Sequence, residues 1–285
     1  MASMITDLGR YIHLHFIETK VISGSSLSYR WWAMKRLLFL ALRGRSKCAS
    51  YLYPKELVVE NALGTFLLPP MSDSILTMNA SKAEYNLQQY FSIPDGQVFL
   101  DIGANGGKYT VMIAKMCSKN LIYSFEPTPS TYHVLTRNVQ LNNVGKQVIT
   151  ANVALGESAG RAKFAQHSSF SGLNRIVADT DAAPTDFQVL DVEVKPLDAF
   201  MEANKIGAER IALIKIDVEG HELSVLKGAS RTLASLPEDC RFLVEIHPHS
   251  TTKDEVFRLM TSHGFCSEEL DEENFMFSKT PNHIS

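Results

Sequence analysis

The feature that most constrains the fold is a regular alternation of short apolar runs and helical stretches that begins near Gln97. The runs are apolar at nearly every position, which is typical of strands buried on both faces of a parallel sheet. We predict strands at Val98–Ile102, Leu121–Phe125, Val148–Ala154, Ile211–Ile216 and Phe242–Ile246. Helices are predicted at residues 107–118, 129–142, 197–205, 222–235 and 253–263, followed by a strand-like FMF. This alternation indicates an α/β fold, with a mostly parallel twisted sheet and helices on both faces.

Residues 1–78 lack the regular alternation of apolar runs and helical stretches. They are predicted to form an extension packed on a domain that spans residues 79–285. Helical spacing of apolar positions predicts helix within residues 1–50, and LVVENALGTFLL predicts two short strands around a turn at 61–64. Residues 79–93 are predicted to be helical. The long polar segment 157–190 interrupts the alternation, so we expect either a hairpin with a mobile loop or a lid.

Composition narrows the classes of partner. The formal net charge of −3 argues against a nucleic-acid-binding surface. Four cysteines without a CxxC pair signal neither a disulfide framework nor a zinc site, and we expect a reducing cytoplasm. The first residues do not read as a secretory signal, and no run is apolar enough for a spanning helix.

Residues 30–47 combine paired tryptophans with six basic groups. We expect this segment to pack on the core or on a second subunit, which would make a homodimer, with lysines and arginines reaching solvent. Contact with a membrane surface is the less favoured alternative.

A glycine-rich turn follows the first predicted strand, in VFLDIGANGGKYTVMIA. In sheets of this kind, ligands bind outside the carboxyl ends of the strands. Gly103, Gly106 and Gly107 let the backbone approach a ligand closely, and the helix that follows offers free N–H groups to a carboxylate. The turn therefore predicts a cofactor site.

Two details favour S-adenosylmethionine (SAM) over a dinucleotide. The sequence D-I-G-A-N-G-G does not fit the dinucleotide fingerprint G-x-G-x-x-G. The second strand ends in Phe125-Glu126-Pro127, and an acid at that place can accept both hydroxyls of a ribose.

Five motifs between residues 84 and 247 resemble the FkbM-type SAM-dependent methyltransferase family. They are D-I-G-A-N-G-G-K-Y-T, F-E-P-T-P-S-T-Y, V-K-P-L-D-A-F, K-I-D-V-E-G-H-E with a downstream L-K-G-A, and L-V-E-I-H. The resemblance implies a Rossmann-like class I methyltransferase fold and O-methylation of a hydroxyl on a sugar, polyketide or other small metabolite. This sequence departs from the family's pattern at Gly106-Gly107, where we expect a bulkier residue followed by glycine.

Carried over by position, the resemblance also implies roles for single residues. Those at the methionine end of SAM would be Asp101, Gly103, Ala104, Asn105 and Gly107. Glu126, followed by Pro127, would hold the ribose, Asn152 would approach the adenine edge, and Asp217 would lie beside the transferable methyl.

Ionisable residues gather at the end of the fourth predicted strand and on the next strand. Because a neutral alcohol is a poor nucleophile, a hydroxyl acceptor needs a base. The candidate catalytic residues are Lys215, Asp217, Glu219, His221 and His247. The histidines suit a base by intrinsic pKa, and we prefer His221, at the strand-to-helix turn, with Asp217 or Glu219 as the alternative. We assign no metal ligands, although Asp217, Glu219 and His247 could instead bind a divalent cation that activates the hydroxyl.

Two other functions remain open from the sequence. A nucleotide-dependent oxidoreductase or epimerase would need a first turn that tolerates pyrophosphate, which Asp101 disfavours. A non-catalytic SAM-binding module would not need the ionisable cluster at residues 217–222.

Overall fold

A seven-stranded sheet forms the centre of the protein in a computed structural model that describes residues 20–21, 31, 56–70, 87–167, 174–177 and 187–279. Its strand order is β13-β14-β12-β11-β4-β5-β6. The parallel strands are β4 (Val98–Ile102), β5 (Leu121–Phe125), β6 (Val148–Ala151), β11 (Ile211–Ile216) and β12 (Arg241–Glu245). β14 (Asn274–Ser278) runs antiparallel to both β12 and β13 (Cys266–Glu269).

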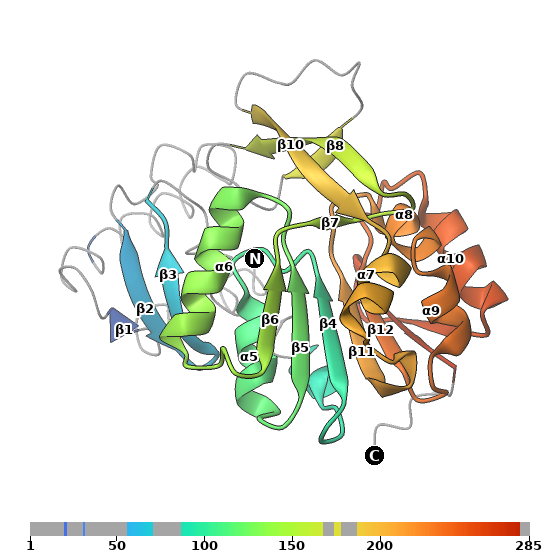
Figure 1. The fold of residues 1–285 in the computed structure, drawn as a ribbon, viewed down its shortest axis with the longest axis horizontal. Helices are drawn as coiled ribbons and strands as arrows, with labels where there is room; N and C mark the ends of the chain where they lie inside the picture. Colours follow the sequence, from blue (N-terminus) through green and yellow to red (C-terminus); the bar gives the residue numbers. More distant parts are fainter. Residues whose placement is uncertain are drawn as a thin grey trace, which may run out of the picture.

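Helices cover both faces of this sheet, as Figure 1 shows. One face packs on α5 (Lys108–Met116) and α6 (Pro129–Leu141), and the other on α7 (Leu197–Asn204), α8 (Glu222–Lys227), α9 (Ser230–Ser235) and α10 (Lys253–Ser262). Successive strand residues point to opposite faces. Phe99 therefore joins the first core and Leu100 the second, and both are fully buried. The α/β fold predicted from the apolar runs, a mostly parallel sheet with helices on both faces, is confirmed.

Two predicted elements are wrong in length because tertiary contacts interrupt them. The strand predicted at 148–154 stops at Ala151, where the side chain of Asn152 donates to the carbonyl oxygens of Glu126 and Pro127. The helix predicted at 222–235 divides into α8 and α9 around Gly228. A Cβ at Gly228 would lie 2.0 Å from the carbonyl oxygen of Gly156, so a neighbouring loop occupies that space.

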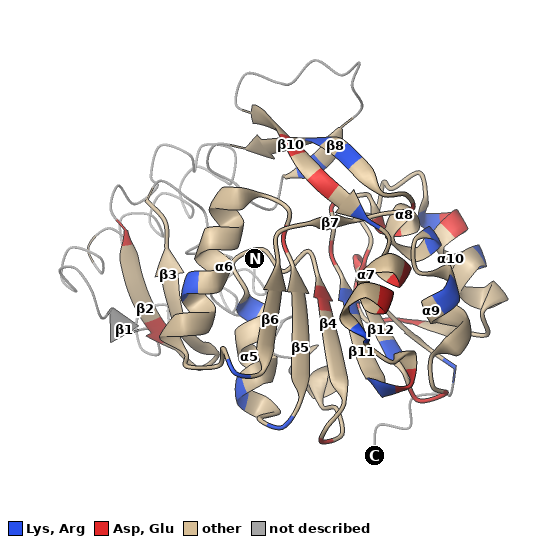
Figure 2. Cartoon of the chain, viewed as in Figure 1, with Lys and Arg blue, Asp and Glu red and all other residues tan. Residues whose placement is uncertain are grey.

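A second, four-stranded sheet lies over the carboxyl ends of the central strands (Figure 1). It consists of β7 (Ala154–Leu155), β8 (Gly160–His167), β9 (Arg175–Val177) and β10 (Phe187–Lys195), in the order β7-β10-β8-β9. β8 and β10 pair antiparallel, so the hairpin expected within residues 157–190 is confirmed in its described part. Charged residues line both strands (Figure 2), and Lys163 forms an ion pair with Asp191 at 2.8 Å. Whether this sheet acts as a lid stays a prediction.

The hairpin predicted around residues 61–64 is confirmed as β2 (Leu57–Asn61) and β3 (Gly64–Leu68). Asn138 of α6 and Asn142, which directly follows this helix, bind the hairpin backbone. Asn142 accepts a hydrogen bond from the Thr65 N–H at 2.8 Å, and Asn138 accepts one from the Leu67 N–H at 2.6 Å. The hairpin therefore packs directly on the α/β core.

The helix predicted within residues 1–50 is wrong at Lys20–Val21, which forms β1 and pairs antiparallel with β2. Of segment 30–47, only Trp31 falls among the described residues. The helix predicted at 79–93 lies outside the described residues over 79–86, and its end contains a 3-10 helix, η3 (Gln88–Phe91). No helix that the structure describes is long and apolar enough to cross a bilayer.

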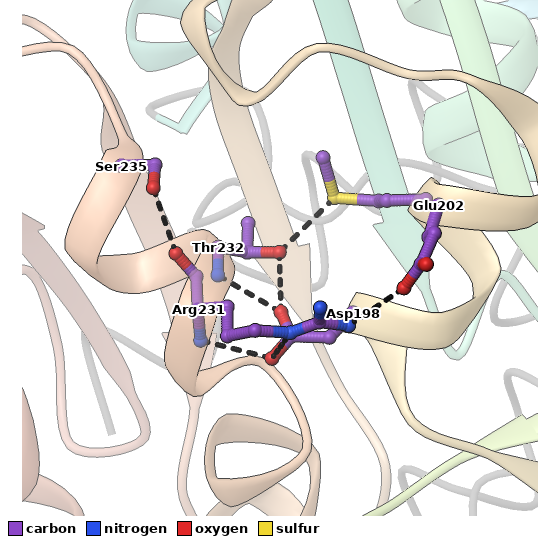
Figure 3. Close-up of polar contacts among 6 residues, drawn as sticks. Asp198, Glu202, Arg231, Thr232 and Ser235 are labelled. Atoms are coloured by element: carbon purple, nitrogen blue, oxygen red, sulfur yellow. Dashed lines mark hydrogen bonds and ion pairs between the residues drawn. The ribbon is translucent and has the colours of Figure 1, made fainter.

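A polar cluster joins α7 to α9 (Figure 3). The Asp198 carboxylate accepts hydrogen bonds from the backbone N–H groups of Arg231 at 2.9 Å and Thr232 at 2.8 Å, and from the Thr232 hydroxyl at 2.6 Å. The first N–H groups of a helix have no partner inside that helix. Asp198 therefore caps α9 from a neighbouring helix.

Candidate active site

The glycine-rich turn after β4 is built by backbone conformations that few side chains tolerate. Gly103 and Gly107 have φ values of 81° and 83°, and Asn105 has a φ of 49°. The N–H groups of Gly103 and Ala104 both donate to the carbonyl oxygen of Phe125, at 3.1 and 2.9 Å. A Cβ on Gly103 would lie 1.8 Å from the carbonyl oxygen of Asp217. Glycine at 103 is therefore needed for both conformation and space.

Glu126 follows β5 and is buried beside this turn. Its carboxylate accepts hydrogen bonds from the N–H of Asn105 at 3.1 Å and from the N–H of Thr128 at 3.0 Å, and also from the Thr128 hydroxyl. Burial raises its pKa to about 7, while these hydrogen bonds oppose the rise. The contact with Asn105 links the predicted ribose residue to the predicted methionine loop.

Asp101 lies behind the turn and not at its surface. Its carboxyl is fully buried, where it accepts a hydrogen bond at 2.5 Å from the Thr110 hydroxyl, and that hydroxyl lies 2.7 Å from the Ser124 hydroxyl. Burial is the main cause that raises the pKa of Asp101. Contacts to α5 and β5 place Asp101 where it can hold the turn in shape.

A cavity of about 250 Å³ opens at the carboxyl ends of β4, β5, β11 and β12. It brings together most of the residues selected from the sequence, namely Gly103, Ala104, Asn105, Glu126, Pro127, Lys215, Asp217, Glu219 and His221. It also extends under the second sheet, which contributes Phe164, Asn174 and Ile176 to its wall. One cavity therefore joins the glycine-rich turn to the ionisable cluster.

Lys215 and Asp217 form an ion pair at the floor of the cavity. The Lys215 Nζ lies 2.8 Å from Oδ2 of Asp217 and 4.6 Å from the ring centroid of Tyr109. The Lys215 side chain is only 2% exposed. Burial alone would lower its pKa, but attraction to Asp217, Glu245 and Asp101 raises it overall, so Lys215 stays a cation.

Two further carboxyl groups face the same cavity from neighbouring strand ends. Burial raises the pKa of Glu219 to about 8, and repulsion from Asp217 and Glu245 adds to the rise. Repulsion from Asp217 and then burial raise the pKa of Glu245 to about 8. Glu219 has a φ of 51°, in the left-handed region, and precedes Gly220 in the turn between β11 and α8.

His221 is half-buried at the start of α8 and lines the cavity. Its Nε2 would lie 3.2 Å from a Cβ at Gly156, so the imidazole fits against a position that has no side chain. Burial lowers the pKa of His221, and the neutral imidazole is favoured at pH 7.

Four of the selected residues do not line the cavity. Asp101 is buried behind it, Gly107 begins α5, and Asn152 bonds to backbone carbonyls. His247 is exposed, because β12 ends at Glu245 and the chain turns, with the Ser250 N–H donating to the His247 carbonyl oxygen. His247 and His221 are therefore not brought together.

The sequence did not select several cavity residues, which are Lys108, Tyr109, Phe164, Asn174, Ile176 and Glu245. Lys108 and Tyr109 follow the glycine-rich turn directly, and Glu245 ends a predicted strand, so their positions carried a usable signal. Among the described residues, no group of three or more His, Cys, Asp or Glu side chains is arranged to hold a metal ion.

Comparison with known proteins decides the family. Residues 101–266 match the sequence model described as the methyltransferase FkbM domain. The chain belongs to this family. It is a methyltransferase, and the methyl donor of the FkbM family is SAM.

Curated FkbM-family relatives are distant. Methyltransferase sdnD of Sordaria araneosa is 27% identical over 61% of this chain and 75% of its own length. Hexuronic acid methyltransferase AglP of Haloferax volcanii is 29% identical over 61% of this chain and 65% of its own length. The 31-O-demethyl-FK506 methyltransferase FkbM of Streptomyces tacrolimicus is 23% identical over 75% of this chain and 93% of its own length. Among solved structures, M. jannaschii TYW2 in complex with AdoMet is similar with a TM-score of 0.42 and 15% identity, over 80% of this chain and 87% of that one.

Proposed function

We propose that this protein transfers the methyl group of SAM to a hydroxyl group of a small molecule. The observation that carries the proposal is the single cavity that extends from the glycine-rich turn to the carboxyl and imidazole groups after β11 and β12. A methyl donor and its acceptor must meet in one enclosed space, since the transfer is an in-line displacement that depends on alignment.

The residues of the turn fit SAM. The start of α5 has no acidic residue in its first turn, and helix N-termini attract carboxylates. The Glu126 carboxylate can still accept hydrogen bonds from ribose hydroxyls, because each of its oxygens can accept from more than one donor. When bound, SAM would supply an electrophilic methyl group. Gly103, Asn105 and Glu126 would hold and orient it.

The acceptor would lie between the ionisable cluster and the second sheet. Phe164 and Ile176 give this side of the cavity an apolar wall, and Asn174 adds a buried amide. Such a mixture suits a compact molecule with hydroxyl groups on an apolar frame. Two of the relatives carry names that fit such acceptors, a hexuronic acid methyltransferase and a 31-O-demethyl-FK506 methyltransferase.

His221 is the base that we propose for the acceptor hydroxyl. Its lowered pKa leaves the imidazole neutral, and a neutral imidazole can take a proton. Asp217 is less suited, because its carboxylate is already bonded to Lys215. Glu219 is the remaining alternative, and its raised pKa means that a large fraction carries a proton near pH 7.

Ligand binding and product analysis together test the proposal. Thermal unfolding should shift upward with SAM and S-adenosylhomocysteine and not with NAD or NADP. Mass spectrometry of metabolites from cells with and without the protein should then reveal a compound heavier by one methyl group. Stabilisation by NAD or NADP alone would instead support the oxidoreductase alternative. SAM binding with no methylated product would support a non-catalytic module.

A further inference from the structure

Two carboxyl groups in the cavity have no bonding partner within the described part of the chain. Glu219 follows β11 and Glu245 ends β12, and these strands are parallel neighbours in the sheet. Asp217 lines the same cavity and is bonded to Lys215. Neither Glu219 nor Glu245 has a hydrogen-bond donor or an ion-pair partner among residues 87–167 and 187–279. Both carboxyl groups are therefore available to a ligand that enters the cavity.

The strongest electrostatic effects on this pair come from charged groups on β11, α5 and α8, on the turn after β11 and directly before β14. Carboxylates outnumber the cations, which are Lys215 on β11 and Lys108 on α5. The acidic neighbours are Asp217 after β11, Glu222 at the start of α8 and Glu273 before β14. With pKa values of about 8, both Glu219 and Glu245 are largely protonated at neutral pH before a ligand binds.

We infer that Glu219 and Glu245 sense the charge on the sulfur atom of the bound cofactor, and so distinguish SAM from S-adenosylhomocysteine. The inference rests on the proposed function, because it requires SAM to occupy this cavity. SAM carries a positive sulfonium. S-adenosylhomocysteine has the same methionine, ribose and adenine parts but a neutral thioether, so the two ligands differ only in the charge and the methyl group.

A nearby positive charge favours the ionised form of a carboxyl group. Binding of SAM should therefore remove a proton from the Glu219–Glu245 pair, whereas binding of S-adenosylhomocysteine should not. This difference in proton release between SAM and S-adenosylhomocysteine is confined to a pH window. Well below the pKa values of the SAM complex the pair is protonated with either ligand, and well above pH 8 it is ionised with either ligand. Between these limits, SAM affinity rises with pH relative to the affinity for S-adenosylhomocysteine.

The consequence for turnover follows directly. Once the methyl group has been transferred, the sulfur is neutral and no longer stabilises the ionised pair. The Glu219–Glu245 pair then regains its proton, and S-adenosylhomocysteine lacks the charge attraction that held SAM. Glu219 and Glu245 would thus favour exchange of product for fresh SAM.

Isothermal titration calorimetry of the full chain with SAM and with S-adenosylhomocysteine tests this inference. Titrations at pH 7.5 in two buffers with different ionisation enthalpies count the protons released. We expect SAM to release about 0.3–1 proton more than S-adenosylhomocysteine, and its relative affinity to increase about threefold to tenfold from pH 6.5 to 8.5.

The double variant Glu219→Gln/Glu245→Gln should still bind both ligands but show no difference in proton release. Glu219→Gln alone, in the exposed turn after β11, serves if the double variant does not fold, and it should reduce the difference. Glu193→Gln, on the exposed face of β10, is the matched control and should retain the full difference. Equal proton release by the two ligands in the wild type, or an undiminished difference in the double variant, would overturn the inference. Failure of the wild type to bind either ligand would count against the proposed function instead.

Discussion

The carbonyl oxygen of Asp217 occupies the space that a side chain at position 103 would need, 1.8 Å from an ideal Cβ on Gly103. The turn after β4 and the turn after β11 are thus in direct backbone contact, and the Asp217 N–H donates to the Ile102 carbonyl oxygen at 3.0 Å. The glycine-rich turn and the ionisable cluster therefore hold each other in place.

Gly103→Ala should abolish SAM binding, because the new Cβ would force the two turns apart, and Gly103→Val should do the same. Gly96→Ala is a matched control, since Gly96 has the same φ of 81° but no atom within 4 Å of its Cβ position. The control carries the conformational strain without the collision, and calorimetry should find its SAM affinity close to wild type. Normal affinity in Gly103→Ala would show that the turn does not hold the cofactor.

Glu126→Ala should weaken SAM binding by roughly 1.5–3 kcal/mol, the range for hydrogen bonds to a charged group. Part of this loss would come from Asn105, whose N–H would lose its acceptor. Glu126→Gln keeps one oxygen that can accept from Thr128 and should retain part of the affinity. Titration calorimetry separates the two variants, and an unchanged affinity in folded Glu126→Ala would remove Glu126 from the site.

His221→Gln should lower kcat by about 10²–10⁴ with little change in SAM affinity, if the imidazole takes the acceptor proton. Because burial lowers the pKa of His221, kcat of the wild type should rise with pH through an apparent pKa below about 6.5. His247→Gln is the control, since His247 is exposed outside the cavity. Near-wild-type turnover by His221→Gln would favour Glu219 as the base.

Asp198→Ala should destabilise the protein by about 0.5–2 kcal/mol, the usual cost of losing a helix cap. Although burial opposes it, hydrogen bonding from Thr232 and the Arg231 backbone holds the pKa of Asp198 below its ordinary value. The stabilisation is therefore complete at neutral pH and is lost as pH falls below about 4. Urea unfolding at pH 7 and at lower pH should show the difference between wild type and variant shrinking with acid.

Glu202→Gln is the control for Asp198, because it removes only an exposed contact with Arg231. The two side chains are 72% and 68% exposed, and such pairs contribute less than about 1 kcal/mol. An effect of Glu202→Gln as large as that of Asp198→Ala would contradict the capping role.

The second sheet should gain amide protection when cofactor and acceptor analogue bind together, if it closes over the acceptor as a lid. In the described region, Gln166 of β8 donates to the Ser130 hydroxyl at 2.6 Å, and the N–H of Glu157, between β7 and β8, donates to the Ser224 hydroxyl at 3.0 Å. Hydrogen exchange of β8 measures this directly. Full protection of β8 in the free protein would make the sheet a fixed wall.

The sequence predicted β4, β5 and β11 at their observed bounds, because strands buried on both faces are apolar throughout. It predicted one helix over 222–235 and missed the break, because the contact of Gly228 with the backbone of Gly156 is not visible in the local sequence. Local patterns do not report such contacts between distant segments.

In the candidate site, too, local patterns predicted some residues, and contacts between distant segments decided others. Motif residues at strand ends could be named because parallel strands bring their carboxyl ends together. Phe164 and Ile176 could not, since they reach the cavity only through the way β8 and β9 fold back over the sheet. His247 was selected because it follows a predicted strand and suits a base by intrinsic pKa, but β12 ends at Glu245 and the chain then turns, which leaves His247 exposed.

The buried side chain of Asn138 has two partners that come from separate segments of the chain, both of which precede α6 in the sequence. It accepts from the Leu67 N–H at 2.6 Å and donates to the Gly106 carbonyl oxygen at 2.7 Å. One amide thus joins the β2–β3 hairpin to the glycine-rich turn. A fragment cut to the FkbM-matched residues 101–266 would strip this asparagine of one partner and bare the apolar surface of α5 and α6. Designers of shortened or chimeric versions should therefore transplant the hairpin together with the catalytic core.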